Sequence, residues 1–152
     1  VRLAEELQRG QRGLSHHLSI VMVDLDDLKL VNDSLGHNAG DRALTWAAGF
    51  LVRELRQHDI CCRLGGDEFV LLLPGTDTIG REQLVNRIRE KLQDQDVTPE
   101  ITVRLSLGGA TWPMDGTTRE ELVAEADSAM YRCKLRQKGG VRRPVGARGG
   151  LG

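Results

Sequence analysis

Residues 65–69 read Gly-Gly-Asp-Glu-Phe, and the two glycines and two acids lie between two short apolar runs near the middle of the chain. The runs span Ile60 to Leu64 and Phe69 to Leu73. Because glycine tolerates positive φ, the pattern predicts a tight β-hairpin with two acids at its tip. Two carboxylates so close together repel each other unless water or a cation separates them. An ordinary acidic turn has the same pattern, so the interpretation depends on a second acidic group.

The second acidic group follows an apolar run from Leu18 to Val23, which is typical of a buried strand. The run leads directly into Asp24, Leu25 and two further aspartates. Since two strands of one sheet can bring their ends together, we expect Asp24 to lie near Asp67 and Glu68. Three carboxylates would suit Mg²⁺, which keeps part of its coordination shell for water and substrate phosphates. The sequence therefore favours a nucleotide triphosphate site over a purely structural ion.

Composition predicts one small domain. The chain has 152 residues, and its 39% hydrophobic content is enough for a single core. A net charge of -1 gives no general attraction to nucleic acid, and we expect no nucleic-acid partner. No apolar run approaches the roughly 20 residues of a membrane span. The three cysteines lack metal-ligand spacing and do not form an even disulfide framework, which favours a reducing, cytoplasmic environment.

Helical and strand periods alternate along the chain, and this predicts an α/β (α+β) fold. The expected sheet is mixed, mainly antiparallel, and surrounded by helices. Apolar stripes at helical spacing are found at Leu44, Ala47, Ala48, Leu51 and Leu55, at Leu84, Val85, Ile88 and Leu92, and at Leu122, Ala126, Ala129, Met130 and Cys133. Strands are expected at Leu18 to Asp24, Ile60 to Leu64, Phe69 to Leu73 and Ile101 to Thr111.

Four sequence blocks in a fixed order resemble the GGDEF domain of the diguanylate cyclase family. They are DLDDLKLVNDSLGHNAGD at Asp24–Asp41, GGDEF at Gly65–Phe69, SLGGATWPMDG at Ser106–Gly116 and ADSAMYRCK at Ala126–Lys134. The blocks span nearly the whole chain, so the resemblance is more specific than a five-letter motif. It implies a palm-like domain similar to nucleotide cyclase catalytic domains, which we place at residues 1–138.

The resemblance also implies a reaction. Two GTP molecules would condense into cyclic di-GMP and two pyrophosphates, with Mg²⁺, or Mn²⁺, as the cofactor. Each domain would present one GTP, so a homodimer would be needed for turnover. The 3′-hydroxyl of one nucleotide would attack the α-phosphorus of the other, and catalysis would come mainly from positioning and electrostatics.

The family's metal-binding and catalytic positions match acids of this sequence. Asp24, Asp67 and Glu68 match the metal-binding acids, and the last two also match the catalytic acids. Leu25 is expected to add its backbone carbonyl to the metal site. A strand-end cap is the alternative for Asp24 alone.

The guanine-reading pair of the family matches Asn32 and Asp41. An amide and a carboxylate can satisfy the acceptors and donors of that base. The alternative is helix capping, with Asp41 opening a helix. A related subgroup that makes mixed purine dinucleotides carries a smaller residue at this position, so Asp41 favours GTP over ATP.

Four further positions are expected to bind the substrate, and two of them depart from the family's pattern. Lys29 and Lys134 match phosphate-contacting lysines, although each would also suit a solvated surface. Leu28 stands where the family usually has phenylalanine. Lys138 replaces an arginine, because the family's AKxxGRN ending reads CKLRQKGG here, and lysine cannot form the paired hydrogen bonds of a guanidinium.

A second site is expected just before the hairpin. Arg56 and Asp59 match the family's RxxD motif for product inhibition, and Arg87 matches a further arginine of that site. Guanidinium and carboxylate groups suit the phosphates and guanine edges of cyclic di-GMP. An exposed charge pair at a helix end is the alternative.

The family's opening segment is absent, so we expect the domain to start upstream of Val1 and to follow a sensory domain, which could anchor the protein to a membrane. Residues 139–152 are rich in glycine and arginine, without periodicity, and are expected to be a disordered tail. Two other functions stay open: a catalytically inactive domain that serves as a cyclic di-GMP receptor, and a regulatory or dimerisation module that binds GTP without chemistry.

Overall fold

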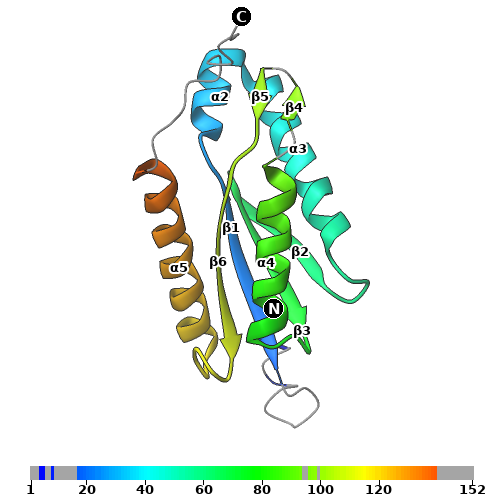
Figure 1. Cartoon of the computed structure of the whole chain (residues 1–152), viewed down its shortest axis with the longest axis vertical. Coiled ribbons are helices and arrows are strands. Elements are labelled where there is room, and N and C mark those ends of the chain that lie inside the picture. The colour runs from blue at the N-terminus through cyan, green and yellow to red at the C-terminus, as the bar shows by residue number, and fades with distance from the viewer. Residues whose placement is uncertain (1–3, 6–7, 9–16, 94–95, 99, 140–152) are drawn as a thin grey trace, which may run out of the picture.

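The computed structural model describes residues 4–5, 8, 17–93, 96–98 and 100–139. Within them, helices and strands alternate along the chain (Figure 1). The strands are β1 (Leu18–Leu25), β2 (Ile60–Gly65), β3 (Glu68–Pro74), β4 (Asp96–Thr98), β5 (Ile101–Thr102) and β6 (Leu105–Trp112). The helices are α2 (Leu28–Leu35), α3 (His37–Glu54), α4 (Thr78–Leu92) and α5 (Arg119–Gly139).

The main sheet has four strands in the order β2-β3-β1-β6, and each neighbouring pair is antiparallel. β1 lies inside the sheet, with Asp24 opposite Glu68 of β3 on one side and Ser106 of β6 on the other. All eight residues of β1 are buried, because both faces of the sheet are covered by helices. β4 and β5 form a separate two-stranded ladder.

Two apolar clusters show which helices cover which face. The larger cluster joins Val21 and Val23 of β1 to residues of α3 and α4. The smaller one joins Ile20 and Met22 of β1 to Leu122 and Ala126 of α5. The alternation of side chains along β1 therefore places α3 and α4 on one face and α5 on the other.

The predicted fold class is confirmed, and the structure corrects three local expectations. The short helix α2 was not predicted. It is separated from α3 by Gly36, whose φ of 88° breaks the helical path. The strand expected over Ile101 to Thr111 is divided, because β5 pairs with β4 whereas β6 pairs with β1. Asp41 does not open a helix, since α3 already begins at His37.

Two other expectations concern residues outside this description. The predicted disordered tail falls, apart from Gly139, on residues 140–152, and the side chain of Lys138 is likewise not described. Among the described helices, none combines the length and apolar character needed to cross a bilayer.

Candidate active site

The hairpin tip is joined to the end of β1 by the backbone. The amide of Leu25 donates a hydrogen bond of 2.8 Å to the carbonyl of Asp67. Gly65 and Gly66 have φ values of 151° and 46°, which glycine adopts at little cost, and they allow the tight turn. Arg63 supports the turn from the side, with two guanidinium hydrogen bonds of 3.1 and 2.7 Å to the Gly66 carbonyl. The expected meeting of the hairpin tip with the end of the first strand is therefore present.

Asp24 is buried at the end of β1, with 5% of its surface exposed. One carboxylate oxygen, Oδ2, accepts a hydrogen bond from the ammonium of Lys134 on α5. The other, Oδ1, is buried without a hydrogen-bond partner among the described residues. Burial raises the pKa of Asp24, the Lys134 hydrogen bond opposes that increase, and the nearby Asp67 carboxylate adds to it. Asp24 thus retains an unsatisfied acceptor in an acidic environment.

Glu68 shares this environment. Burial raises the pKa of Glu68, and the charges of Asp24, Asp67 and Asp127 raise it further. The mutual repulsion and the free Asp24 oxygen suit a divalent cation with oxygen ligands. Among the described residues, however, no three His, Cys, Asp or Glu side chains are grouped closely enough to bind a metal. The acids fit the expected cation chemically, but the side chains would have to reorient to bind it.

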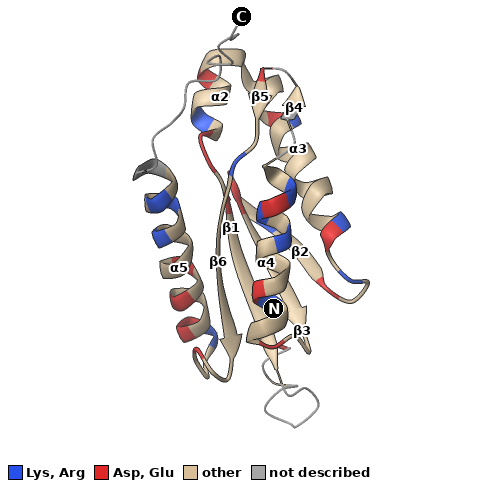
Figure 2. Cartoon of the chain, viewed as in Figure 1, with Lys and Arg blue, Asp and Glu red and all other residues tan. Residues whose placement is uncertain are grey.

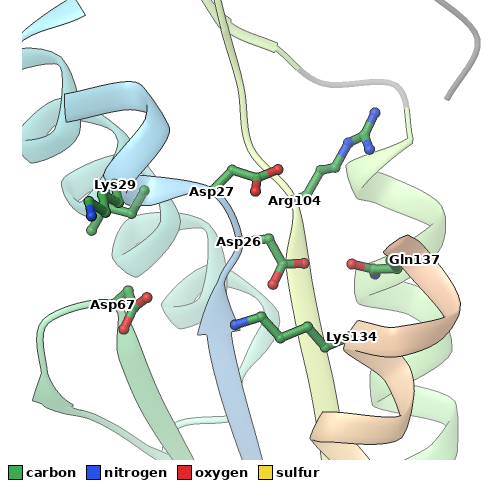
Figure 3. Close-up of a pocket in the computed structure, with 8 residues that line it drawn as sticks. Asp26, Asp27, Lys29, Asp67, Arg104, Lys134 and Gln137 are labelled. Carbon is green, nitrogen blue, oxygen red and sulfur yellow. The ribbon is translucent and has the colours of Figure 1, made fainter. Parts of the chain in front are cut away.

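A pocket of about 210 Å³ lies beside these acids (Figure 3). Its lining residues come from the turn after β1, the start of α2, the hairpin tip, the segment before β6 and the end of α5. They are Asp26, Asp27, Leu28, Lys29, Asp67, Arg104, Lys134 and Gln137. Figure 2 shows that acidic and basic residues meet at this end of β1, whereas the central strands are largely uncharged. Four predicted site residues therefore line one pocket: Leu28, Lys29, Asp67 and Lys134.

The start of α2 provides backbone donors at this pocket. Asp27 adopts a left-handed conformation with φ of 60°, and its carbonyl accepts the first helical hydrogen bond, 3.0 Å from the Val31 amide. The amides of Leu28 and Lys29 belong to the first turn of the helix, where backbone N–H groups lack intrahelical partners. Helix starts of this kind bind phosphate groups well. A strained non-glycine residue at the pocket also fits a functional turn.

Four residues that line the pocket were missed by sequence reasoning: Asp26, Asp27, Arg104 and Gln137. The Ser106 hydroxyl lies 2.9 and 2.8 Å from the two carboxylate oxygens of Asp26, and burial raises the pKa of Asp26. The Gln137 amide donates a 3.0 Å hydrogen bond to the carbonyl of Leu105. Gln137 departs from the family's glycine at this position, and that departure was its only signal. Arg104 gave none, because it belongs to a segment that was predicted to be continuous strand.

The expected guanine-reading pair is divided between two helices, with Asn32 on α2 and Asp41 on α3. Asn32 packs so closely against Gly40 that a Cβ at Gly40 would be 1.7 Å from Asn32 Oδ1. Asp41 is the next residue and is exposed. Oδ1 of Asn32 is buried without a hydrogen-bond partner among the described residues. The Asn32 side chain therefore has an available acceptor oxygen beside Gly40, the residue before Asp41.

A smaller pocket of about 50 Å³ contains the three residues expected to bind the product. Arg56, Asp59 and Arg87 all line it, together with Glu54. The Arg56 amide donates to Asp59 Oδ2 at 2.9 Å, whereas Asp59 Oδ1 is buried without a partner in the described structure. Arg87 donates to the carboxylate and the carbonyl of Glu54 at 2.9 and 2.8 Å. The tertiary structure thus gathers residues that are up to 31 positions apart, counted from Arg56 to Arg87.

Curated proteins with similar sequences are larger than this chain. The bifunctional diguanylate cyclase/cyclic di-GMP phosphodiesterase MucR of Pseudomonas aeruginosa is 38% identical over 143 residues, which cover 91% of this chain and 20% of MucR. Diguanylate cyclase TpbB of the same species is 35% identical over 144 residues, 90% of this chain and 33% of TpbB. The chain thus spans one fifth to one third of the length of these relatives.

Solved structures and the family comparison agree with this match. The crystal structure of the GGDEF domain of TpbB, also called YfiN, from Pseudomonas aeruginosa superposes with a TM-score of 0.81 at 32% identity, covering 89% of this chain and 86% of that one. The diguanylate cyclase SiaD of the same species, solved in complex with its activator SiaC, has a TM-score of 0.79 at 35% identity, with coverage of 89% and 52%. Residues 1–140 match the family described as "Diguanylate cyclase, GGDEF domain". The chain therefore belongs to the GGDEF family of diguanylate cyclase domains.

Proposed function

We propose that this domain condenses two GTP molecules into cyclic di-GMP, releasing two pyrophosphates. The observation that carries the proposal is the meeting of Asp24, Asp67 and Glu68 at one end of the sheet, beside a pocket lined by Lys29 and Lys134. Family membership supports the same activity. In this proposal each domain presents one GTP, and a second copy of the chain presents the other.

Asp24, Asp67 and Glu68, with the Leu25 carbonyl, would hold the divalent cation, Mg²⁺ or Mn²⁺. When bound, the cation would help to activate the attacking 3′-hydroxyl and neutralise charge at the transferred phosphorus. The first turn of α2, Lys29 and Lys134 would bind the phosphates and keep them in line for attack. Lys134 can pair with Asp24 before GTP binds and with a phosphate afterwards, because its ammonium lies at Asp24 and the residue lines the pocket.

Asn32 and Asp41 would select guanine. The unpaired Asn32 oxygen can accept from the base, and a carboxylate at Asp41 can accept from the N1 and N2 donors. Leu28 would contact the nucleotide from the start of α2, and Lys138 would add a charge at the end of α5. These roles predict GTP rather than ATP as the substrate.

The first experiment measures cyclic di-GMP by chromatography and mass after incubation of the purified domain with GTP and Mg²⁺. Several protein concentrations are compared, because a reaction that needs two domains should rise faster than linearly with protein. Asp67→Asn should lower turnover by at least about a hundredfold, since it removes a charge from the reacting centre. The isosteric Glu120→Gln, at the opposite end of α5, should leave the rate unchanged. Full activity of Asp67→Asn would refute the metal-site assignment.

Product inhibition is proposed at the Arg56, Asp59 and Arg87 pocket. The unpaired Asp59 oxygen and the two guanidinium groups supply the acceptors and donors that a cyclic dinucleotide requires. Arg56→Ala should raise the cyclic di-GMP concentration for half-inhibition about tenfold or more while turnover without product is kept. Arg53→Ala, an exposed arginine that does not line this pocket, is the matched control. Unchanged inhibition in Arg56→Ala would exclude this site.

The same pocket supports a second candidate, a cyclic di-GMP receptor without turnover. Equilibrium binding of cyclic di-GMP together with no product from GTP, at every protein concentration, would favour the receptor over the enzyme. The assay is repeated on a longer chain, and turnover there would restore the enzyme proposal.

A further inference from the structure

Arg104 forms part of the nucleotide pocket on the wall opposite the hairpin acids (Figure 3). It lies between β5 and β6, where the chain passes from one sheet to the other. Its carbonyl accepts a 2.9 Å hydrogen bond from the amide of Asp26. This bond fixes the backbone of Arg104 beside the turn that follows β1.

The guanidinium of Arg104 is available to a ligand. Within the described part of the chain, it takes part in no hydrogen bond or ion pair, and the residue is exposed. Lys134, by contrast, is already bound to Asp24. Of the described residues that line the pocket, Arg104 is the one that carries a guanidinium.

The position of Arg104 also indicates which part of a nucleotide it would meet. Asp67 lies on one wall of the pocket, and Arg104 and Gln137 lie on the other, with the turn at Asp26 and Asp27 between them (Figure 3). If the hairpin acids act at the α-phosphate, the triphosphate tail would extend across the first turn of α2 toward the opposite wall. The β- and γ-phosphates, which leave as pyrophosphate, would then lie nearest to Arg104.

We propose that Arg104 is a phosphate-binding residue that contacts the departing β- and γ-phosphates of GTP. A guanidinium can donate two parallel hydrogen bonds to a phosphate, which an ammonium cannot do. The C-terminal end of the domain carries Lys138 in place of the family's arginine, and Arg104 supplies a guanidinium from the segment between β5 and β6. This inference rests on the proposed function, because it assumes that GTP occupies this pocket.

The proposal predicts that Arg104 affects nucleotide affinity only through the outer phosphates. The test measures binding by calorimetry with 3′-deoxy-GTP and 3′-deoxy-GMP in the presence of Mg²⁺. Both probes lack the attacking hydroxyl, so no product forms. Arg104→Gln should weaken the binding of 3′-deoxy-GTP about tenfold, as expected for loss of a charge-assisted contact. It should leave the affinity for 3′-deoxy-GMP unchanged. The affinity of Arg104→Lys for 3′-deoxy-GTP should fall between those of Arg104→Gln and the wild type, since lysine keeps the charge without the paired donors.

Arg136→Gln is the matched control, because Arg136 is an exposed arginine that precedes the pocket residue Gln137 on α5 but lines a different groove. It should bind both nucleotides as the wild type does. Unchanged binding of 3′-deoxy-GTP to Arg104→Gln would overturn the proposal, and so would an equal loss for both nucleotides, which would indicate a purely structural role.

Failure of the proposed function gives a different pattern. If the wild type binds neither nucleotide, both the cyclase and the role of Arg104 are refuted. If the wild type binds 3′-deoxy-GTP but forms no cyclic di-GMP from GTP, only the activity is refuted. The selective effect of Arg104→Gln on the triphosphate would then still support its phosphate contact.

Discussion

At the scale of single residues, Glu54 shows how neighbouring charges determine the state of a carboxylate. Its side chain is 7% exposed, and it accepts hydrogen bonds from Arg87 at 2.9 Å and from Lys91 at 2.7 Å. Burial alone would raise the pKa of Glu54, but the hydrogen bonds and charges of Lys91 and Arg87 outweigh it and lower that pKa. The charged form of Glu54 therefore stabilises the contact between α3 and α4.

A lowered pKa in the folded state contributes stability above the ordinary glutamate value of 4.5, and this contribution is lost as the pH falls through the lowered pKa. Glu54→Gln should reduce the free energy of unfolding by about 1 kcal/mol at pH 7, because its two partners are half exposed. The difference from the wild type should disappear at strongly acidic pH. Urea unfolding at several pH values measures it.

Glu90→Gln is the control for this prediction, since Glu90 is exposed on α4 and its side chain forms no ion pair with the described residues. It should change stability little at any pH. A loss for Glu54→Gln that stays constant with pH would show that the charge of Glu54 contributes nothing.

At the scale of secondary structure elements, the contact between α5 and β6 depends on Gly108. A Cβ at Gly108 would lie 2.0 Å from the Met130 amide nitrogen and 2.4 Å from the Ala126 carbonyl oxygen, both backbone atoms of α5. The helix can pack this closely only because the strand has no side chain there. Since Lys134 and Gln137 are on the same helix, the spacing also sets the position of two pocket residues.

Gly108→Ala should destabilise the domain by about 3 kcal/mol, because the backbone of α5 would have to move. Gly49→Ala is a matched control within α3, where the added Cβ would meet only a flexible Arg53 nitrogen at 3.7 Å. It should stabilise the domain by about 0.5–1 kcal/mol through helix propensity. Equal stability of the two variants in urea unfolding would contradict the close packing of α5 on β6.

At the scale of the whole molecule, the fold places the acids that we propose to bind the metal at one end of the sheet. The hairpin tip, the end of β1 and the start of α2 all meet there, and the pocket proposed to bind GTP lies beside them. In our proposal each domain binds one GTP in this pocket. The proposed condensation therefore requires a second domain, which brings its own GTP.

This requirement predicts interference between active and inactive copies. When wild-type domain at a fixed concentration is mixed with a tenfold excess of Asp67→Asn, mixed pairs form by mass action, and turnover should fall by about half or more. The same excess of serum albumin controls for crowding and should leave the rate unchanged. Turnover that stays constant in the presence of Asp67→Asn would indicate that one domain acts alone.

Much of the fold could be predicted from local patterns. The spacing of apolar residues located β1, the β2-β3 hairpin and three helices. It could do so because helices and strands repeat with different periods, and each period shows which side of the element is buried. Motif matches proposed the site residues, and four of these line one pocket. The short helix α2 and the division of the strand after Ile101 could not be predicted in this way. Both depend on backbone turns and on the choice of pairing partner.

The sequence by itself determined most of the secondary structure, the family and the acids offered for chemistry, because those are properties of neighbouring residues and of ordered motifs. Only the tertiary structure decided which distant groups meet. It joins Lys134 to Asp24 across 110 residues, places Arg104 on the wall opposite Asp67, and gathers Arg56, Asp59 and Arg87 in one pocket. The physical reason is that strand pairing and helix packing set distances between remote residues, which no local periodicity encodes.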